Sequence, residues 1–174
     1  MRKIAIVGPE SSGKTTLAMA LGEHLQAPVV PEHARTFLEL AGPNYAEDDL
    51  LRIAHGQVLS EERLMADRPE LLVCDTDLIT IRIWSEEKYG RCDPWIGEQS
   101  EKREYDLWLL CSPEGIPWEP DPLRENPHDR DRLFQVYMEM LEKLSKPFVI
   151  VHGGRDVRLK AALKAIQVID QGKE

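Results

Sequence analysis

The stretch GPESSGKT at Gly8–Thr15 decides the fold, because it fits the pattern GxxxxGK[ST]. It directly follows a strand-like apolar run at Lys3–Val7 and directly precedes a segment with helical spacing that begins near Lys14. A strand before this pattern and a helix after it are the context that the pattern requires in a phosphate-binding loop. The sequence therefore predicts a strand, a phosphate-binding loop and a helix at its start.

The fixed residues of this loop each have a chemical reason. Gly8 and Gly13 let the backbone turn so that successive N–H groups point at phosphate oxygens, and the positive end of the following helix reinforces them. Lys14 is expected to reach the β- and γ-phosphates, and the hydroxyl of Thr15 is expected to bind Mg²⁺. The pattern thus predicts ATP and Mg²⁺ as ligands, while a preference for ATP over GTP stays open. The residues expected to hold the nucleotide are Gly8, Glu10, Ser11, Ser12, Gly13, Lys14, Thr15 and Thr16.

Apolar runs with strand character alternate with helical segments along the chain. These runs are apolar throughout, which indicates strands covered on both faces by helices. They lie at Ile4–Val7, Leu71–Cys74, Leu107–Cys111 and Phe148–Val151, with a weaker fifth strand at Pro28–Val30. Helices are expected at about 14–25, 45–67, 77–88, 130–144 and 157–169. We therefore predict an α/β protein of the P-loop NTPase type, with a five-stranded parallel sheet sandwiched by helices.

Residues Ser112–Asp129 break this alternation, because the segment holds five of the twelve prolines. Such proline density opposes a regular helix or strand pairing. The apolar residues Ile116, Trp118 and Leu123 need a partner surface, which favours an ordered lid over a site. A packed crossover without a functional role is the alternative. No composition shift marks a second domain, so residues 1–174 are expected to form one domain.

Composition and charge narrow the classes of partner. A chain of 174 residues with 42% hydrophobic and 30% charged residues has the composition of an ordinary globular domain. Its formal net charge of −9 opposes general binding of nucleic acid, whose backbone carries the same sign. A signal peptide and a membrane-spanning stretch are not expected, which favours a cytoplasmic protein. The three cysteines lack CxxC spacing and predict neither disulfides nor a zinc site. The oligomeric state stays open.

Carboxylates follow two of the expected strands. Asp75 ends a strand in a region where open α/β sheets bind ligands, so it is expected to hold Mg²⁺ together with Thr15. Asp77 could share that task, face an acceptor hydroxyl, or cap the helix that follows. Glu32 follows the weak strand and could orient an acceptor hydroxyl, while Arg35 could hold a phosphate or a substrate anion. Solvated residues at a helix start are the alternative for both.

Arginines and tryptophans supply further candidates. Arg124, inside the proline-rich segment, is preferred for bringing positive charge over the γ-phosphate. Arg130 and Arg132 could do the same, but their acidic neighbours also fit surface ion pairs that contribute little. Three tryptophans could either stack on a planar ring of a ligand or belong to the core: Trp84, Trp95 and Trp118.

Six stretches together resemble the ribosylnicotinamide kinase domain of the NadR-type NAD-biosynthesis proteins, within the P-loop kinases. They are GPESSGKTTL at Gly8–Leu17, EHAR at Glu32–Arg35, VCDTDLIT at Val73–Thr80, KYG at Lys88–Gly90, YDLWLL at Tyr105–Leu110 and PWEPDPLR at Pro117–Arg124. The first is shared by many ATPases, whereas the later stretches in this order are much more specific. The resemblance implies Mg-ATP and transfer of the γ-phosphoryl group to the 5′-hydroxyl of a ribosyl-pyridine.

This chain also departs from that family in two ways. Relatives often have Trp before the glutamate of the EHAR stretch and Tyr after it, where this chain has Pro31 and His33. It also lacks the adenylyltransferase domain of those proteins, so it looks like a stand-alone kinase. The residues expected to contact the substrate are Glu32, Arg35, Asp77, Trp118 and Asp121.

We therefore expect a kinase that acts on a nucleoside-like alcohol, with nicotinamide riboside as the first candidate. The expected catalytic residues are Lys14, Glu32, Asp77 and Arg124. Whether Glu32 or Asp77 orients the acceptor hydroxyl stays open. Two alternatives are an NTP hydrolase that uses water as acceptor and a nucleotide-sensing module that turns nothing over.

Overall fold

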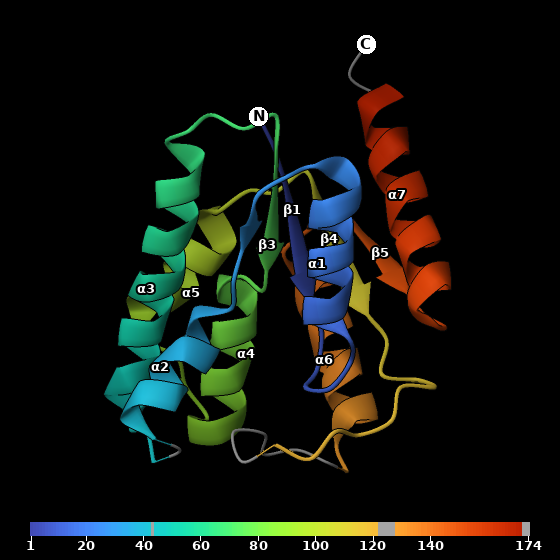
Figure 1. Cartoon of the computed structure of the whole chain (residues 1–174). Coiled ribbons are helices and arrows are strands. Elements are labelled where there is room, and N and C mark those ends of the chain that lie inside the picture. The colour runs from blue at the N-terminus through green and yellow to red at the C-terminus, as the bar shows by residue number, and fades with distance from the viewer. Residues whose placement is uncertain (43, 122–127, 172–174) are drawn as a thin grey trace.

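A five-stranded parallel sheet forms the centre of the protein (Figure 1). The computed structural model describes residues 1–42, 44–121 and 128–171. The strand order is β2-β3-β1-β4-β5, and every neighbouring pair is parallel. The strands are β1 (Arg2–Val7), β2 (Val29–Val30), β3 (Leu71–Asp75), β4 (Leu107–Cys111) and β5 (Phe148–Val151). The predicted fold class is confirmed, including the weak second strand.

Helices connect the strands and cover the sheet. They are α1 (Lys14–Leu25), α2 (His33–Ala41), α3 (Glu47–Met65), α4 (Leu78–Tyr89), α5 (Pro94–Lys102), α6 (Arg130–Lys143) and α7 (Arg155–Gln171). Five of them were predicted within a few residues, whereas α2 and α5 were not. The start of α5 carries a local signal, since Pro94 occupies its first turn and the Asp93 carboxylate accepts a hydrogen bond from the backbone N–H of Trp95 at 2.8 Å.

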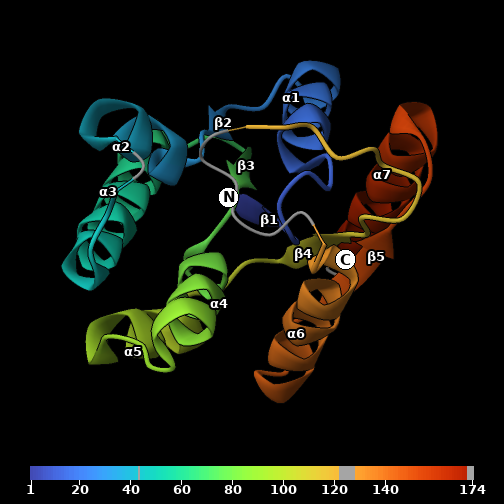
Figure 2. The same ribbon diagram turned by 90° about the horizontal axis from the view of Figure 1, so that it is seen from below.

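The two faces of the sheet bury separate apolar clusters, which explains the uninterrupted apolar runs of the sequence. Alternate residues of β1 divide between the clusters: Ile4 and Ile6 pack toward α1 and α7, while Ala5 and Val7 pack toward α4 and α6. Figure 2 shows these two helix pairs on opposite sides of the sheet. Residues 4–7 of β1 are buried on both faces, so the end of this strand is a fixed base for the loop that follows it.

A third apolar cluster lies beside the sheet and packs the four helices α2, α3, α4 and α5 against one another. It joins Ala34 of α2, Ile53 of α3, Leu78 of α4 and Ile96 of α5. The contact between α2 and α3 is close, because a Cβ atom on Gly56 would lie 2.0 Å from Nε2 of His33. Glycine at this position therefore lets the His33 ring lie directly on α3, and it holds the start of α2 in place.

The strand order creates a topological switch at β1, which lies between β3 and β4. The chain passes from β1 to β2 and β3 on one side and then crosses to β4 and β5 on the other. Ligands of open α/β sheets bind in the crevice at the carboxyl ends of the strands, at such a switch point. In the described part of the chain, no helix has both the length and the apolar character needed to cross a membrane.

Candidate phosphoryl-transfer site

The loop between β1 and α1 has the backbone conformation that its glycines allow. Gly8 has φ 141° and Gly13 has φ 81°, both in the region that favours glycine. A Cβ atom on Gly8 would lie only 2.7 Å from the carbonyl oxygen of Cys111. The loop can thus pass close to the end of β4 only because Gly8 has no side chain. Gly13 caps α1, whose first turn contains no acidic residue, so the helix start is electrostatically suited to an anion.

Two side chains brace the loop from within. The hydroxyl of Ser12 donates to the carbonyl of Pro9 at 2.8 Å, and the ammonium of Lys14 donates to the same carbonyl at 2.9 Å. Ser12 is fully buried, while Lys14 is half-buried and lines the cavity described below. The Lys14 ammonium is therefore held at the loop by a neutral carbonyl and is positioned for an anionic ligand.

Asp75 lies at the carboxyl end of β3 with an incompletely satisfied carboxylate. The residue is 3% exposed, and its buried Oδ1 atom has no hydrogen-bond partner among the described residues. Burial raises the pKa of Asp75 to about 6, against the lowering effect of the Thr15 hydroxyl beside it and of Lys14. A buried carboxylate oxygen left open next to a threonine hydroxyl matches the hard oxygen ligands that Mg²⁺ prefers. Asp75 and Thr15 thus lie together as the sequence predicts.

Asp77 occupies a different environment from Asp75. Its Oδ1 accepts a hydrogen bond from the backbone N–H of Thr80 at 3.2 Å, and its Oδ2 accepts one from the indole Nε1 of Trp108 at 2.8 Å. Burial raises the pKa of Asp77 to about 6, although the Trp108 hydrogen bond opposes this. Asp77 does not line the cavity. The structure therefore favours the helix-capping interpretation of Asp77 over contact with a substrate.

The residue between these two aspartates has a strained backbone. Thr76 has φ 81°, which a β-branched side chain rarely adopts. It is 2% exposed, and within residues 1–42, 44–121 and 128–171 its hydroxyl has no hydrogen-bond partner. Its backbone N–H donates to the carbonyl of Ile6 at 3.0 Å, which fixes the turn against β1. Such strain concentrates at functional sites, where the surrounding structure enforces it.

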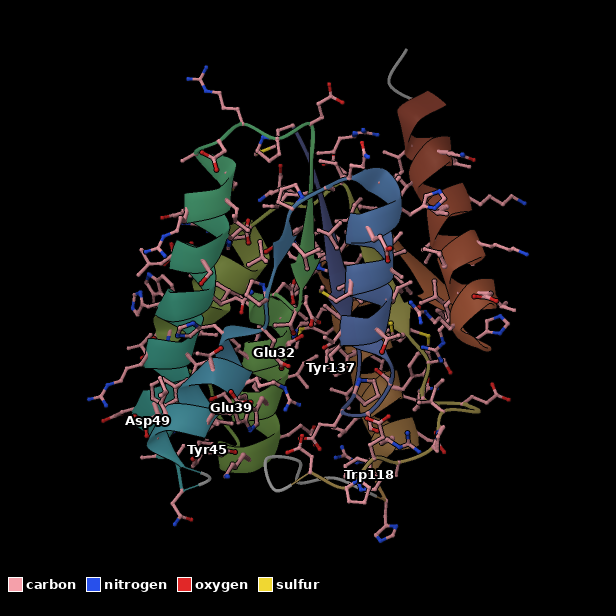
Figure 3. All side chains as sticks on the ribbon, in the orientation of Figure 1. Glu32, Glu39, Tyr45, Asp49, Trp118 and Tyr137 are labelled. Carbon is pink, nitrogen blue, oxygen red and sulfur yellow. The ribbon has the colours of Figure 1, made fainter. Side chains whose placement is uncertain are left out.

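A cavity of about 870 Å³ extends from the loop across the carboxyl edge of the sheet. One part is lined by the loop residues from Gly8 to Thr16 and by Arg155 and Arg158 of α7. The other part is lined by polar and aromatic side chains near α2, α4 and α6. They are Glu32 and Arg35 at the start of α2, Trp84 and Lys88 of α4, Arg132 and Tyr137 of α6, and Asp121. Figure 3 shows Glu32 and Tyr137 close to the ends of the strands. The cavity thus joins the predicted phosphate loop to a second compartment.

Glu32 and Arg35 reach the cavity from the start of α2. Glu32 is the N-cap residue of this helix and is half-buried. The guanidinium of Arg35 pairs with the carboxylate of Asp121 at 3.1 Å, which joins α2 to the segment after β4. Three of the residues expected from the sequence to contact a substrate therefore lie in one region of the structure.

The three tryptophans considered from the sequence have different places. Trp84 lines the cavity, and its indole donates to the hydroxyl of Tyr45 at 2.7 Å. Trp95 packs on the ring of His55 with ring centroids 4.0 Å apart, and Trp118 lies over the guanidinium of Arg130 at 5.7 Å. Of these three, only Trp84 is positioned to stack on a ligand in the cavity.

The segment after β4 packs on the loop, as Figure 2 shows where it crosses from the α7 side toward α2. The hydroxyl of Ser11 accepts from the backbone N–H of Glu119 at 3.0 Å. The guanidinium of Arg130 donates to the carbonyls of Ser11 and Ile116, each at 3.0 Å. This part of the predicted lid therefore covers Ser11. Arg124, the predicted catalytic arginine, lies outside the described residues.

Arg132, the other arginine considered beside it, forms ion pairs at the mouth of the cavity. Its guanidinium pairs with Asp129 at 2.6 Å and also with Glu87 of α4. Arg132 lines the cavity from the start of α6. The surface ion pairs that the sequence allowed for this arginine are thus present, and one of them joins α6 to α4.

The sequence did not identify the buried residues that support the site without having been expected to bind a ligand. The side-chain oxygen of Gln57 on α3 accepts the backbone N–H of His33 at 2.8 Å and fixes the helix start that carries Glu32. Gln57 is 2% exposed and shares its helix face with buried Ile53. The signal in the sequence was that polar Gln57 occupies a position in the apolar stripe of α3 where a core residue is expected. Tyr137, buried on α6, had no signal that distinguishes it from a core aromatic residue.

A parallel sheet switched at β1, with a glycine-rich loop leading into α1, defines a P-loop fold. A family model described as AAA domain matches residues 3–158, so the chain belongs to this AAA domain family. No curated protein sequence matches the chain.

Solved structures with the same fold include two of NadR proteins. A NadR protein in complex with NAD and AMP-PNP has a TM-score of 0.71 and 22% identity, covering 88% of this chain and 44% of that chain. A NadR protein in complex with NR has a TM-score of 0.72 and 23% identity, covering 97% and 51%. This chain spans about half the length of these proteins. The resemblance expected from the sequence is confirmed for the fold.

A nucleoside kinase also shares the fold over its whole length. The deoxyadenosine kinase from M. mycoides, with the products dCMP and dCDP bound, has a TM-score of 0.67 and 14% identity. The match covers 95% of this chain and 99% of that chain. The fold of this chain is therefore found both in a kinase of similar extent and in part of a longer protein.

Proposed function

We propose that this protein is an ATP-dependent kinase that transfers the γ-phosphoryl group to the hydroxyl of a nucleoside-like acceptor, with nicotinamide riboside as the first candidate. The observation that carries this proposal is the continuous cavity between the loop at Gly8–Thr16 and a compartment lined by Glu32, Arg35, Trp84 and Tyr137. A hydrolase needs room for water only, whereas this compartment offers an aromatic wall and opposite charges to a larger acceptor.

The loop would bind the phosphates of ATP. Its backbone N–H groups and the start of α1 would hold the β- and γ-phosphates, and Lys14 would exchange its contact with the Pro9 carbonyl for phosphate oxygens. Glu10, Ser11, Ser12 and Thr16 complete the proposed nucleotide contacts. Arg155, which lines the same part of the cavity, lies on the side where the remainder of the nucleotide would extend.

Thr15 and Asp75 would hold Mg²⁺, the second expected ligand. The unpartnered Oδ1 of Asp75 and the adjacent Thr15 hydroxyl supply oxygen ligands, and ATP phosphates and water would complete the coordination. Mg²⁺ binding would also favour the ionised form of Asp75, whose pKa burial raises to about 6. When bound, the ion offsets the charge that develops on phosphate oxygens during transfer.

Glu32 is our candidate for orienting the acceptor, in place of Asp77. Its carboxylate would accept the proton of the acceptor hydroxyl while the hydroxyl oxygen bonds to the γ-phosphorus and the bond to the ADP oxygen breaks. Arg35, held by Asp121, would bind the transferred phosphoryl group or an anionic substrate group. Trp84 and Tyr137 would stack on the base of the acceptor, a role that the sequence had suggested for Trp84, Trp95 and Trp118.

The comparisons support this proposal without choosing the acceptor. The similar NadR proteins were solved with AMP-PNP and with NR, and the similar deoxyadenosine kinase was solved with nucleotide products. All share the fold at low identity, and Pro31 and His33 of this chain flank Glu32 where the NadR-type family often has aromatic residues. Nicotinamide riboside is thus one member of a class of candidate acceptors, and a test must include others.

ADP formation tests the proposal directly. Purified protein with Mg-ATP would be given nicotinamide riboside, the common ribo- and deoxyribonucleosides, or no acceptor. Turnover that depends on one of these compounds is expected. Phosphate release that is independent of every acceptor would identify a hydrolase instead, and ATP binding without turnover would identify a sensing module.

A matched pair of variants on α2 then tests the role of Glu32. Glu32→Gln should lower kcat while ATP affinity stays unchanged, because the carboxylate faces the acceptor compartment. Thr36→Ala, an exposed change on the same helix, is the control and should leave kcat unchanged. Unchanged kcat in Glu32→Gln would remove Glu32 from the chemistry.

A further inference from the structure

We propose that Arg158 is a positioning residue that sets the phosphate loop in its nucleotide-binding conformation. This inference rests on the proposed function only in taking the loop as the nucleotide site. Arg158 lies in the first turns of α7, far in sequence from the loop, and it is 3% exposed. A buried arginine requires a structural or functional reason, because removal of its charge from water is costly.

The Arg158 guanidinium joins three separate segments of the chain. Its Nη1 donates to the carbonyl of Ser12 at 2.6 Å, its Nη2 to the carbonyl of Ser112 at 2.6 Å, and its Nε to the carbonyl of Gly153 at 2.7 Å. These carbonyls belong to the phosphate loop, to the start of the segment that covers Ser11, and to the turn between β5 and α7. One planar group therefore fixes the relative positions of all three segments.

The contact with Ser12 orients the loop for an anion. A trans peptide is planar, and its C=O and N–H groups point in opposite directions. Because the Ser12 carbonyl points at Arg158, the N–H of Gly13 points away from it. Gly13 has φ 81° and is the cap residue of α1, so this N–H belongs to the set that a phosphate would bind. Arg158 thus selects the orientation of one peptide group in the site.

The charge of Arg158 provides a second contribution. All three acceptors are neutral carbonyls, and among the described residues no carboxylate pairs with this guanidinium. Arg158 lines the cavity, and its Nη1 lies 3.6 Å from the place of a Cβ on Gly13. A buried cation that no described carboxylate neutralises thus lies beside the loop, so nucleotide phosphates would supply the missing negative charge.

The proposal predicts an effect on the nucleotide side of the cavity alone. Arg158→Ala should weaken ATP binding, measured by calorimetry, by about 10- to 100-fold, since it removes three charge-assisted hydrogen bonds that orient the loop. KM for the acceptor identified in the panel should stay near the wild-type value. Lys160→Ala, an exposed change on the same helix, is the control and should change neither quantity.

Two further measurements separate positioning from a merely structural role. Methylguanidinium, tested against equal NaCl, should restore ATP affinity to Arg158→Ala but not to Lys14→Ala, because it can refill the space left by the side chain. Arg158→Lys keeps the charge but not the three-way geometry, so its ATP affinity should lie between those of the wild type and Arg158→Ala. This second variant decides the matter if the alanine variant does not fold.

Wild-type ATP affinity in folded Arg158→Ala or in Arg158→Lys would overturn the inference, as would equal weakening of ATP and acceptor binding. Lack of rescue by methylguanidinium in folded Arg158→Ala would also overturn it. Because ATP affinity is measured without turnover, this result is independent of the acceptor panel. Failure of the proposed kinase activity would be seen in the wild-type protein, and failure of this inference only in the variants.

Discussion

The two ends of the sheet both bury carboxylates, but they satisfy them differently. At the amino end, Glu61 of α3 pairs with Lys3 and with Arg103, each at 3.0 Å, and its Oε2 accepts from the hydroxyl of Tyr105 at 2.7 Å. At the carboxyl end, Asp75 keeps a buried oxygen that accepts no hydrogen bond from the part of the chain that the structure describes. Protein groups bind both oxygens of the Glu61 carboxylate, whereas one oxygen of Asp75 is left for a ligand.

The difference is reflected in the direction of the two pKa shifts. Burial raises the pKa of Glu61, but the Tyr105 hydrogen bond and the charges of Arg103 and Lys3 outweigh it, so the pKa of Glu61 lies below its ordinary value. For Asp75 burial dominates, and the pKa rises to about 6. Glu61 therefore stabilises the fold when ionised, whereas ionised Asp75 destabilises the fold until a ligand compensates it.

The largest expected effect is on catalysis at the carboxyl end. Lys14→Ala should lower kcat/KM by about 10³-fold, because it removes the side chain expected to bind the transferring phosphoryl group. Its melting temperature should stay near that of the wild type, since the one hydrogen bond of the Lys14 ammonium within the described part of the chain is to the Pro9 carbonyl. Kinetics and thermal unfolding, with Lys160→Ala as control, measure both. Full activity in Lys14→Ala would refute the loop assignment.

The next largest effect is on stability at the amino end. Glu61→Gln should lower the free energy of unfolding by about 3 kcal/mol at pH 7.5, because it leaves two cations without their buried partner. The loss should shrink as the pH falls through the lowered pKa of Glu61, where the wild-type carboxyl also loses its charge. Urea unfolding measures this, with exposed Glu62→Gln as the control. Wild-type stability would show that the cluster does not support the fold.

A smaller effect of opposite sign is expected for Asp75. Asp75→Asn should raise the free energy of unfolding at pH 7.5 by about 1–2 kcal/mol, because the wild type must keep a buried carboxylate ionised. The gain should shrink as the pH falls from about 6 toward 3.8, the ordinary pKa of aspartate, because the folded wild type then binds the proton that removes this cost. The same variant should lose activity and Mg²⁺ dependence. Destabilisation at pH 7.5, with Asp67→Asn as control, would contradict this account.

The smallest effect is expected where the charges of an ion pair remain in water. Arg91 and Glu47 pair through two contacts of 2.7 and 2.6 Å on the surface. Arg91→Ala should shift the urea midpoint less than either buried change, and the shift should vanish in about 1 M NaCl. A shift as large as that of Glu61→Gln would mean that burial does not explain the difference between the two ends.

Local sequence patterns predicted most of the fold and the loop itself. The apolar runs, the GxxxxGK[ST] pattern and the position of Asp75 each depend on residues close together in the chain, so their structural meaning could be inferred. The environment of Asp77 could not, because its partner Trp108 lies 31 residues away on β4. Whether an aspartate caps a helix or contacts a substrate depended on that tertiary contact.

Helix α2 and the role of Arg158 could not be predicted from the sequence for the same reason, because both depend on contacts between distant segments. The start of α2 depends on two residues of α3. The side-chain oxygen of Gln57 accepts the backbone N–H of His33, and Gly56 leaves room for the His33 ring. The three carbonyls bound by Arg158 come from distant segments that no spacing rule connects. Contacts between distant segments set the fine geometry of the site, and periodicity does not report them.

The hydrogen bond between Trp108 and Asp77 also gives the protein an internal optical reference. The Trp108 indole is 1% exposed and fixed by a carboxylate, so its fluorescence should be blue-shifted and insensitive to ligands. Trp84 lines the cavity, and its emission should respond when an aromatic acceptor stacks there. The difference between the wild type and a Trp84→Phe variant would isolate the Trp84 emission from that of the other three tryptophans. Acceptor binding could then be followed by fluorescence in the unlabelled protein.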